Sequence, residues 1–185
     1  MISQRAATSA PVVQARAEQL PFADRIFDAV LGVLTLHHWA DAARGLAECH
    51  RVAADRVAFF TLDAEVGARF WLFEYFPEIA EIDRRIFPSM GFLSRQLGEV
   101  IVTPVPIPAD CLDGFGGAYW KRPSAYLDPT VRAGMSTFSR IKHAATGLRR
   151  LQHDLQSDLW IQRHQDLLDL DELDLGYRIV TARAS

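Results

Sequence analysis

The sequence has few cysteines and lacks a long hydrophobic run. Its two cysteines, Cys49 and Cys111, lie far apart and form no Cys-X-X-Cys pair, which argues against a disulfide framework or a zinc ribbon. We expect both to be reduced, buried and inert, as in a cytoplasmic protein. The longest apolar run, residues 29–36, is far shorter than the ~20 residues that cross a bilayer, and residues 1–11 lack the apolar core of a signal peptide. We therefore expect no membrane contact.

The chain also lacks an excess of basic residues. Its 185 residues include 20 Lys and Arg against 23 Asp and Glu, a net charge of −3. A non-specific nucleic-acid binder usually has a basic surplus, so we expect no nucleic-acid partner. Hydrophobic residues make up 49% and charged residues 23%, which is typical of a folded domain. We expect a single domain over residues 1–185, with an inserted cap or substrate-binding segment at 108–175.

The hydrophobic pattern predicts an α/β fold. Residues 27–34 and 56–62 are near-continuous apolar runs, the pattern of strands buried on both faces of a parallel sheet. Between them, Asp41 can cap a helix by accepting from the free N–H groups of its first turn. Together these segments form one right-handed βαβ unit. Further strands are expected at 12–15, 100–107 (an edge strand, because prolines alternate there) and 177–182, with helices in 70–76, after Pro77, at 94–99 and at 146–168.

Two motifs flank the first buried strand. Residues 17–22 read Ala-Glu-Gln-Leu-Pro-Phe, and the sequence LTLHHWAD follows the strand at residues 34–41. Ligands in open α/β sheets bind at the carboxyl ends of strands, so Thr35, His37 and His38 are well placed to line a site. From the residues alone, a functional site and the simple start of a helix remain equally open.

Together with Phe27-Asp28-Ala29-Val30 between them, these motifs resemble the middle of class I S-adenosylmethionine-dependent methyltransferases, most closely the small-molecule branch described as type 11. In that family, an AExLPF loop follows the third strand, and FDxVxxxxxLHHxxD covers the fourth strand and the turn into its helix. The resemblance implies an incomplete Rossmann-like sheet, mostly parallel, with an antiparallel last strand and a helical insertion before it. It also implies S-adenosylmethionine as cofactor and a small-molecule substrate.

The resemblance assigns cofactor contacts by position. Arg16, Ala17 and Glu18 correspond to the residues that bind adenine, although the family usually has an acid where this chain has Arg16. Leu34, Thr35 and His37, at the end of the fourth strand, would lie near the methionine part of the cofactor.

The histidine pair supplies the candidate catalytic residues. Most such enzymes hold a nucleophile in line with the methyl group, and positioning of this kind can contribute roughly 7–11 kcal/mol. Where a base is needed, His37 or His38 is the candidate, because an imidazole titrates near neutral pH. No metal site is expected, since a third ligand at suitable spacing is lacking and the acidic run 169–174 contains no glycine-bearing calcium loop.

The segment 110–128 is rich in glycine and aromatic residues. Insertions after the fifth strand often shape the acceptor pocket of this family, and such pockets combine aromatic walls with a few polar groups. Tyr119, Trp120 and Arg122 are therefore predicted to contact the substrate, together with Tyr75. Two alternatives stay open: a packed surface insertion for 110–128, and a core role for the aromatic residues between 70 and 76.

One family feature is missing from the 185 residues. The glycine-rich (D/E)xGxGxG cofactor loop should precede the AExLPF loop, but only eleven residues precede the predicted strand at 12–15. The chain is thus expected to be N-terminally truncated by two strand–helix units, roughly 50 residues. The 27–34 strand would then have an open edge, which either the 12–15 strand or another chain, as in a homo-oligomer, would cover.

Two functions remain open at this point. The first is a small-molecule methyltransferase that is impaired in cofactor binding as this chain and becomes an enzyme once completed by N-terminal residues. The second is a non-catalytic fragment or pseudoenzyme that serves as a binding or interaction module.

Overall fold

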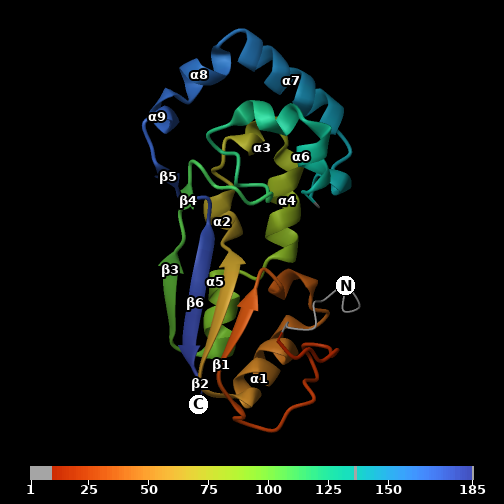
Figure 1. Ribbon diagram of the computed structural model, residues 1–185, viewed down its shortest axis with the longest axis vertical. Coiled ribbons are helices and arrows are strands. Elements are labelled where there is room, and N and C mark those ends of the chain that lie inside the picture. The colour runs from red at the N-terminus through yellow and green to blue at the C-terminus, as the bar shows by residue number, and fades with distance from the viewer. Residues whose placement is uncertain (1–9, 136, 185) are drawn as a thin grey trace.

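The main sheet has four strands in the order β1-β2-β6-β3. The computed structural model describes residues 10–135 and 137–184, and Figure 1 shows the sheet in a lower lobe beneath a helical upper lobe. The strands are β1 (Phe27–Val33), β2 (Ala53–Leu62), β3 (Val100–Pro104) and β6 (Tyr177–Arg183). β1 and β2 pair in parallel, while β6 is antiparallel to both β2 and β3. This confirms the predicted Rossmann-like α/β sheet with its last strand antiparallel, and it confirms β3 as an edge strand.

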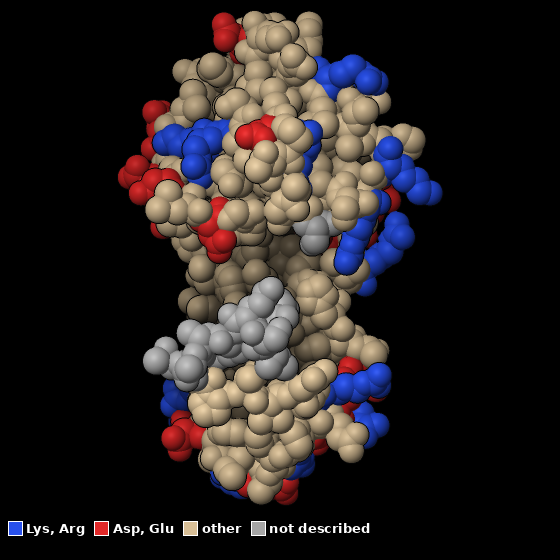
Figure 2. All heavy atoms as spheres, turned by 45° about the vertical axis from the view of Figure 1, so that its right-hand side comes forward, with Lys and Arg blue, Asp and Glu red and all other residues tan. Residues whose placement is uncertain are grey.

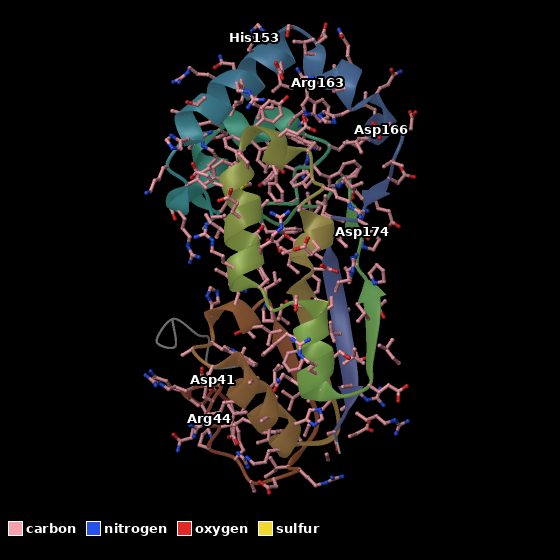
Figure 3. The ribbon with its side chains drawn as sticks, turned by 180° about the vertical axis from the view of Figure 1, so that it is seen from behind. Asp41, Arg44, His153, Arg163, Asp166 and Asp174 are labelled. Carbon is pink, nitrogen blue, oxygen red and sulfur yellow. The ribbon has the colours of Figure 1, made fainter. Side chains whose placement is uncertain are left out.

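The βαβ unit forms as predicted. Helix α1 (Ala42–Val52) begins where the Asp41 carboxylate accepts a hydrogen bond from the Arg44 backbone N–H at 3.0 Å. Its apolar stripe, which includes Leu46, packs on the sheet together with α5 (Met90–Leu97). Figure 3 shows α1, with Asp41 and Arg44 labelled, and α5 on the same face of the strands.

The opposite face of the sheet departs from the prediction. Leu31 and Val33 of β1 are 68% and 56% exposed, so this strand is buried on one face only. The reason is that α1 and α5 cover one face, and no helix among residues 10–135 and 137–184 covers the other side of β1. A continuous apolar run therefore marks a strand here without requiring burial on both sides.

The predicted strand at 12–15 is wrong. These residues form no strand, and Val12 and Val13 are about half exposed, at 46% and 54%. The chain that follows is held against α1 instead of β1, because the Arg51 guanidinium donates to the carbonyl oxygens of Leu20 and Phe22. The outer edge of β1 has no strand beside it within the described part of the chain. Coverage of that edge by another chain stays a prediction.

The upper lobe, which we call the cap, comprises residues 64–86 and 105–175. Its helices are α2 (Ala64–Gly67), α3 (Leu72–Tyr75), α4 (Pro77–Ile86), α6 (Pro129–Ala133), α7 (Ala144–Gln156), α8 (Leu159–Arg163) and α9 (Gln165–Leu168), with 3₁₀ turns η3 (Pro123–Leu127) and η4 (Phe138–Arg140) and paired strands β4 (Ile107–Pro108) and β5 (Glu172–Leu173). No helix in the described residues is both long and apolar enough to span a membrane.

Several predicted boundaries change in the cap. The helix expected over 70–76 shrinks to α3, because Pro77 starts the next helix. The long helix expected at 146–168 divides into α7, α8 and α9, with Asp158 in the left-handed conformation at the first break, φ 57°. This break lets the chain fold back over the cap core, where Trp160 is 1% exposed.

The beginnings of two elements also shift. The helix expected at 94–99 starts earlier, at Met90, because the Ser89 hydroxyl accepts from the Phe92 N–H at 3.1 Å. The strand expected at 100–107 stops at Pro104, which lacks a donor for the ladder.

Gly176 joins the cap to β6. It has φ of 88°, and its carbonyl accepts from the Asp63 N–H at 2.7 Å at the end of β2. An added Cβ would meet the Asp63 carbonyl oxygen at 2.5 Å, so only glycine fits this crossing.

Candidate active site

A pocket of about 290 Å³ lies between the sheet and the cap. Leu34 and His37 reach it from the carboxyl end of β1, and Leu62 reaches it from the end of β2. Helix α4 contributes Asp83 from the cap side. Figure 2 shows that the molecular surface is hollowed between the two lobes. The pocket therefore occupies the edge of the sheet where α/β proteins bind ligands.

The chain turns sharply at the end of β1. Leu34 has φ of 44°, in a region that residues other than glycine rarely adopt, and its N–H donates to the Phe60 carbonyl at 2.8 Å. Strain of this kind costs on the order of 1–3 kcal/mol and is concentrated at functional sites. The 3₁₀ turn η2 (Leu36–His38) follows at once and brings His37 to the pocket.

His37 is the histidine of the pair that lines the pocket. Its ring lies 4.4 Å from the Phe87 ring and 3.9 Å from the His38 ring, between centroids. Its Nδ1 is buried and has no hydrogen-bond partner in the described residues. Burial, and next the neighbouring His38 and Arg140, lower the pKa of His37 to about 4. The ring is therefore neutral at pH 7 and has a free lone pair, and its lowered pKa makes it a weaker base than an ordinary imidazole.

Asp83 is the second unpaired polar group, and sequence reasoning missed it. Its side chain lines the pocket, the residue is 8% exposed, and desolvation raises its pKa to about 6. Its position in α4 gave a usable signal, since it lies four residues after Ile79 and three before Ile86, on the apolar stripe of the helix. An acid on that stripe is costly unless it meets a ligand or a partner.

Tyr177 also lines the same pocket. Its ring stacks on Phe60 at 5.7 Å and meets Phe115 edge-on at 5.2 Å. Burial, and next the charge of Asp83, raise the pKa of Tyr177 above its ordinary value. The phenol therefore keeps its proton and remains a hydrogen-bond donor.

The predicted cofactor residues 16–18 form a tight turn. The Gln19 N–H donates to the Arg16 carbonyl at 3.1 Å, and the Glu18 carboxylate accepts from the Asp41 N–H at 3.1 Å. That hydrogen bond lowers the pKa of Glu18 and ties the turn holding Ala17 to the start of α1. The predicted cofactor residues therefore lie in a structured turn beside the LTLHHWAD segment, and their contact with the cofactor stays a prediction.

A second set of contacts anchors this turn. Glu48 of α1 accepts from the Leu20 N–H at 2.8 Å and pairs with Arg51 at 2.7 Å.

Thr35, at the end of β1, makes a local hydrogen bond. Its hydroxyl accepts from the Trp39 indole N–H at 3.2 Å. Of the predicted cofactor residues, Leu34 lines the pocket, whereas the side chains of Glu18 and Thr35 make local hydrogen bonds.

The four residues predicted to contact substrate lie elsewhere in the cap. Tyr75 is buried and donates to the Asp154 carboxylate at 2.8 Å. Trp120 is fully buried and donates to the Ile107 carbonyl at 2.9 Å. Arg122 lies over the Tyr119 ring, 4.9 Å from its centroid. None of the four lines the pocket as the described residues define it. Its aromatic walls come from Phe70, Phe73, Phe87, Phe115, Phe138 and Tyr177.

The described residues contain no group of three or more His, Cys, Asp or Glu side chains that could hold a metal ion. Both cysteines are free, as expected. Burial raises the pKa of Cys49 to about 11, so this thiol stays protonated at neutral pH. Cys111 is only half-buried, because it lies on a loop at the edge of the cap core.

Comparisons with known proteins agree with this geometry. Residues 1–61 match a family model described as a methyltransferase domain. A solved structure from Anabaena variabilis, assigned as a methyltransferase of an antibiotic biosynthesis pathway, is 30% identical and has a TM-score of 0.83. The match covers 92% of this chain and 72% of that chain.

Two further solved structures are more distant. One, assigned as a methyltransferase from Bacillus halodurans, is 15% identical over 94% of this chain and 76% of that chain, with a TM-score of 0.45. The other, the YcgJ protein from Bacillus subtilis, is 17% identical over 92% and 69%, with a TM-score of 0.42. No curated protein matches the chain.

Proposed function

Because the chain belongs to the class I S-adenosylmethionine-dependent methyltransferase family, we propose that it serves methyl transfer to a small molecule held in the pocket. The observation that carries the proposal is the position of the pocket. It opens where β1 ends, so Leu34 and His37, which the family resemblance assigns to the cofactor side, also touch the cavity. A molecule in the cavity would therefore lie against the predicted methyl-donor side.

The residues of this chain fit the cofactor only in part. The turn at 16–18 and the end of β1 offer contacts for its adenine and methionine parts. The glycine-rich stretch 114–117 does not replace the missing loop, because Gly116 and Gly117 line the acceptor pocket and no strand of the main sheet leads into it.

The chain's own contribution to the reaction is positioning and proton acceptance. The aromatic walls exclude water from the acceptor and restrict its orientation, which is the main requirement of methyl transfer. The neutral His37 imidazole can accept a proton from the acceptor's nucleophile. The His38 ring contacts the His37 ring at a tilt and does not line the pocket as the described residues define it, so we assign it a supporting role.

We expect the 185-residue polypeptide to bind S-adenosylmethionine weakly, with a dissociation constant on the order of millimolar or above. The physical reason is the missing glycine-rich loop, whose backbone would approach the cofactor closely. Isothermal titration calorimetry measures this directly. A micromolar dissociation constant would contradict the expectation of impaired binding.

We expect His37→Ala to lower kcat/KM for methyl transfer by about 100-fold and His38→Ala by much less. The assay uses S-adenosylmethionine with a labelled methyl group at millimolar concentration and a panel of small hydroxy and amino compounds. Since the pKa of His37 is about 4, its protonation leaves the rate flat between about pH 6 and 8. Equal losses in the two variants would contradict the assignment of His37.

The same assay separates the two classes of function. Label recovered in the low-mass fraction supports a small-molecule acceptor, and label recovered only on protein contradicts it. No transfer to any acceptor, in a folded protein, favours the alternative of a non-catalytic methyltransferase-like binding module. The observation that favours this alternative is the absence of the glycine-rich loop from the 185 residues.

A further inference from the structure

We propose that the pocket takes aromatic hydroxy compounds, and that the ligand's hydroxyl group donates a hydrogen bond to the Asp83 carboxylate. The identity of such a compound as the methyl acceptor rests on the proposed function. Its binding does not, because the cavity and its polar groups belong to this chain alone.

The first argument is the isolation of Asp83. The residue is 8% exposed, yet its carboxylate has no hydrogen-bond or ion-pair partner among the described residues. The neighbouring charges of α4 point elsewhere and are paired: Arg84 lies 3.4 Å from Glu65, and Arg85 lies 3.5 Å from Glu81. A buried carboxylate without a partner is unfavourable, and a donor brought by a ligand would satisfy it.

The second argument is the shape and lining of the cavity. Five phenylalanine rings and the Tyr177 ring contribute to its walls, and aromatic rings pack well against one another in offset or edge-on arrangements. Its volume of about 290 Å³ is at the small end for ligand pockets. A compact compound of one or two rings therefore suits the space better than a large one.

The third argument is the balance of donors and acceptors. Arg140 and Tyr177 bring hydrogen-bond donors to the lining, whereas Asp83, on the α4 side, brings an unpaired carboxylate that can only accept when ionised. A phenolic hydroxyl donates to such a carboxylate while staying neutral at pH 7, since its pKa is about 10 in tyrosine. An aliphatic amine would be protonated at this pH and would lack the lone pair that a methyl acceptor needs.

The test compares two ligands of similar size that differ in one hydrogen-bond donor. 2-Naphthol carries the hydroxyl, whereas 2-methoxynaphthalene lacks it. Equilibrium dialysis against the 185-residue chain, at pH 8 and without cofactor, gives both dissociation constants. We expect 2-naphthol to bind at least about tenfold tighter, as a hydrogen bond to a charged group allows.

Asp83→Leu should reduce that preference to less than about threefold. The variant replaces an unpaired buried charge by an apolar side chain, so it is expected to fold, and circular dichroism checks this. Should it fail to fold, Asp83→Asn serves instead and should give an intermediate preference, because its amide accepts a weaker, neutral hydrogen bond. Glu81→Gln, on the exposed side of the same helix, is the matched control and should retain the full preference.

Equal binding of the two ligands to the unaltered chain, or an unchanged preference in the Asp83 variants, would overturn the inference. These results would not bear on the proposed methyl transfer, because the binding assay contains no cofactor. Conversely, an intact preference for 2-naphthol without any methyl transfer would count against the proposed function alone.

Discussion

Trp120→Ala is expected to lower the free energy of unfolding by about 3–5 kcal/mol, the range for truncating a large buried aromatic residue. Trp120 is fully buried in the cap core, and its indole N–H donates to the Ile107 carbonyl at 2.9 Å. Its removal leaves a cavity and a buried carbonyl without its donor. Urea denaturation followed by circular dichroism measures the change.

Two variants accompany this measurement. Leu112→Ala, in the same segment but at a side chain that is 95% exposed, should change stability by less than about 0.5 kcal/mol. Trp120→Phe should lie between the two, because it keeps most of the packing and loses the hydrogen bond. Were Trp120→Ala instead to leave stability unchanged and abolish ligand binding, the substrate role predicted from the sequence would stand and the structural role would be wrong.

Asp83→Asn is expected to raise the free energy of unfolding at pH 8, by up to about 3 kcal/mol, and to have little effect at pH 4. The folded protein holds the pKa of Asp83 at about 6, against an ordinary value of 3.8. Ionisation therefore disfavours the folded state, and stability falls as the pH rises from 3.8 through about 6. At 1.36 kcal/mol for each tenfold change in proton concentration, this interval corresponds to about 3 kcal/mol.

The measurement is a series of urea denaturation curves between pH 3 and 8. Below pH 4 both states are protonated and the penalty vanishes, so the curves of the variant and the unaltered chain should converge there. Glu81→Gln, which removes an exposed carboxylate from the same helix, should show no comparable pH dependence. The stability difference between Asp83→Asn and the unaltered chain should grow in favour of the variant from pH 4 to pH 8. A difference that changes in the opposite direction would contradict the assigned environment of Asp83.

Local sequence signals predicted the lower lobe well. Asp41 starts α1 because a side-chain acceptor and the free N–H groups of the first turn are neighbours in the chain. β1 and β2 form because each contains a short, near-continuous apolar run, which favours a strand over a long helix. The error at residues 12–15 has a non-local cause, since a strand there would have required a neighbouring strand to pair with. The Arg51 contacts hold the following loop against α1 instead.

The cap shows where such reasoning ends. Aromatic composition predicted a pocket in 110–128, and Phe115 of this segment does line the cavity. Trp120 does not, and a tryptophan that lines a ligand site and one that fills a core look the same in sequence. Trp71 and Trp160 meet edge-on at 5.1 Å, and Trp71 donates to the Trp120 carbonyl at 2.9 Å. These contacts, between residues far apart in the chain, decide that Trp120 belongs to the core.

The sequence by itself therefore determined the βαβ unit, the antiparallel last strand, the absence of a glycine-rich cofactor loop from these 185 residues and the family. It also placed His37 at the end of a strand, because the end of a strand and the turn after it are determined by residues that are neighbours in the sequence. Only the tertiary structure decided that His37 rather than His38 lines the cavity, and that Asp83 lies there unpaired. Both outcomes depend on how the end of α4, with Phe87 against the His37 ring, meets the turn after β1, which no local pattern in either segment specifies.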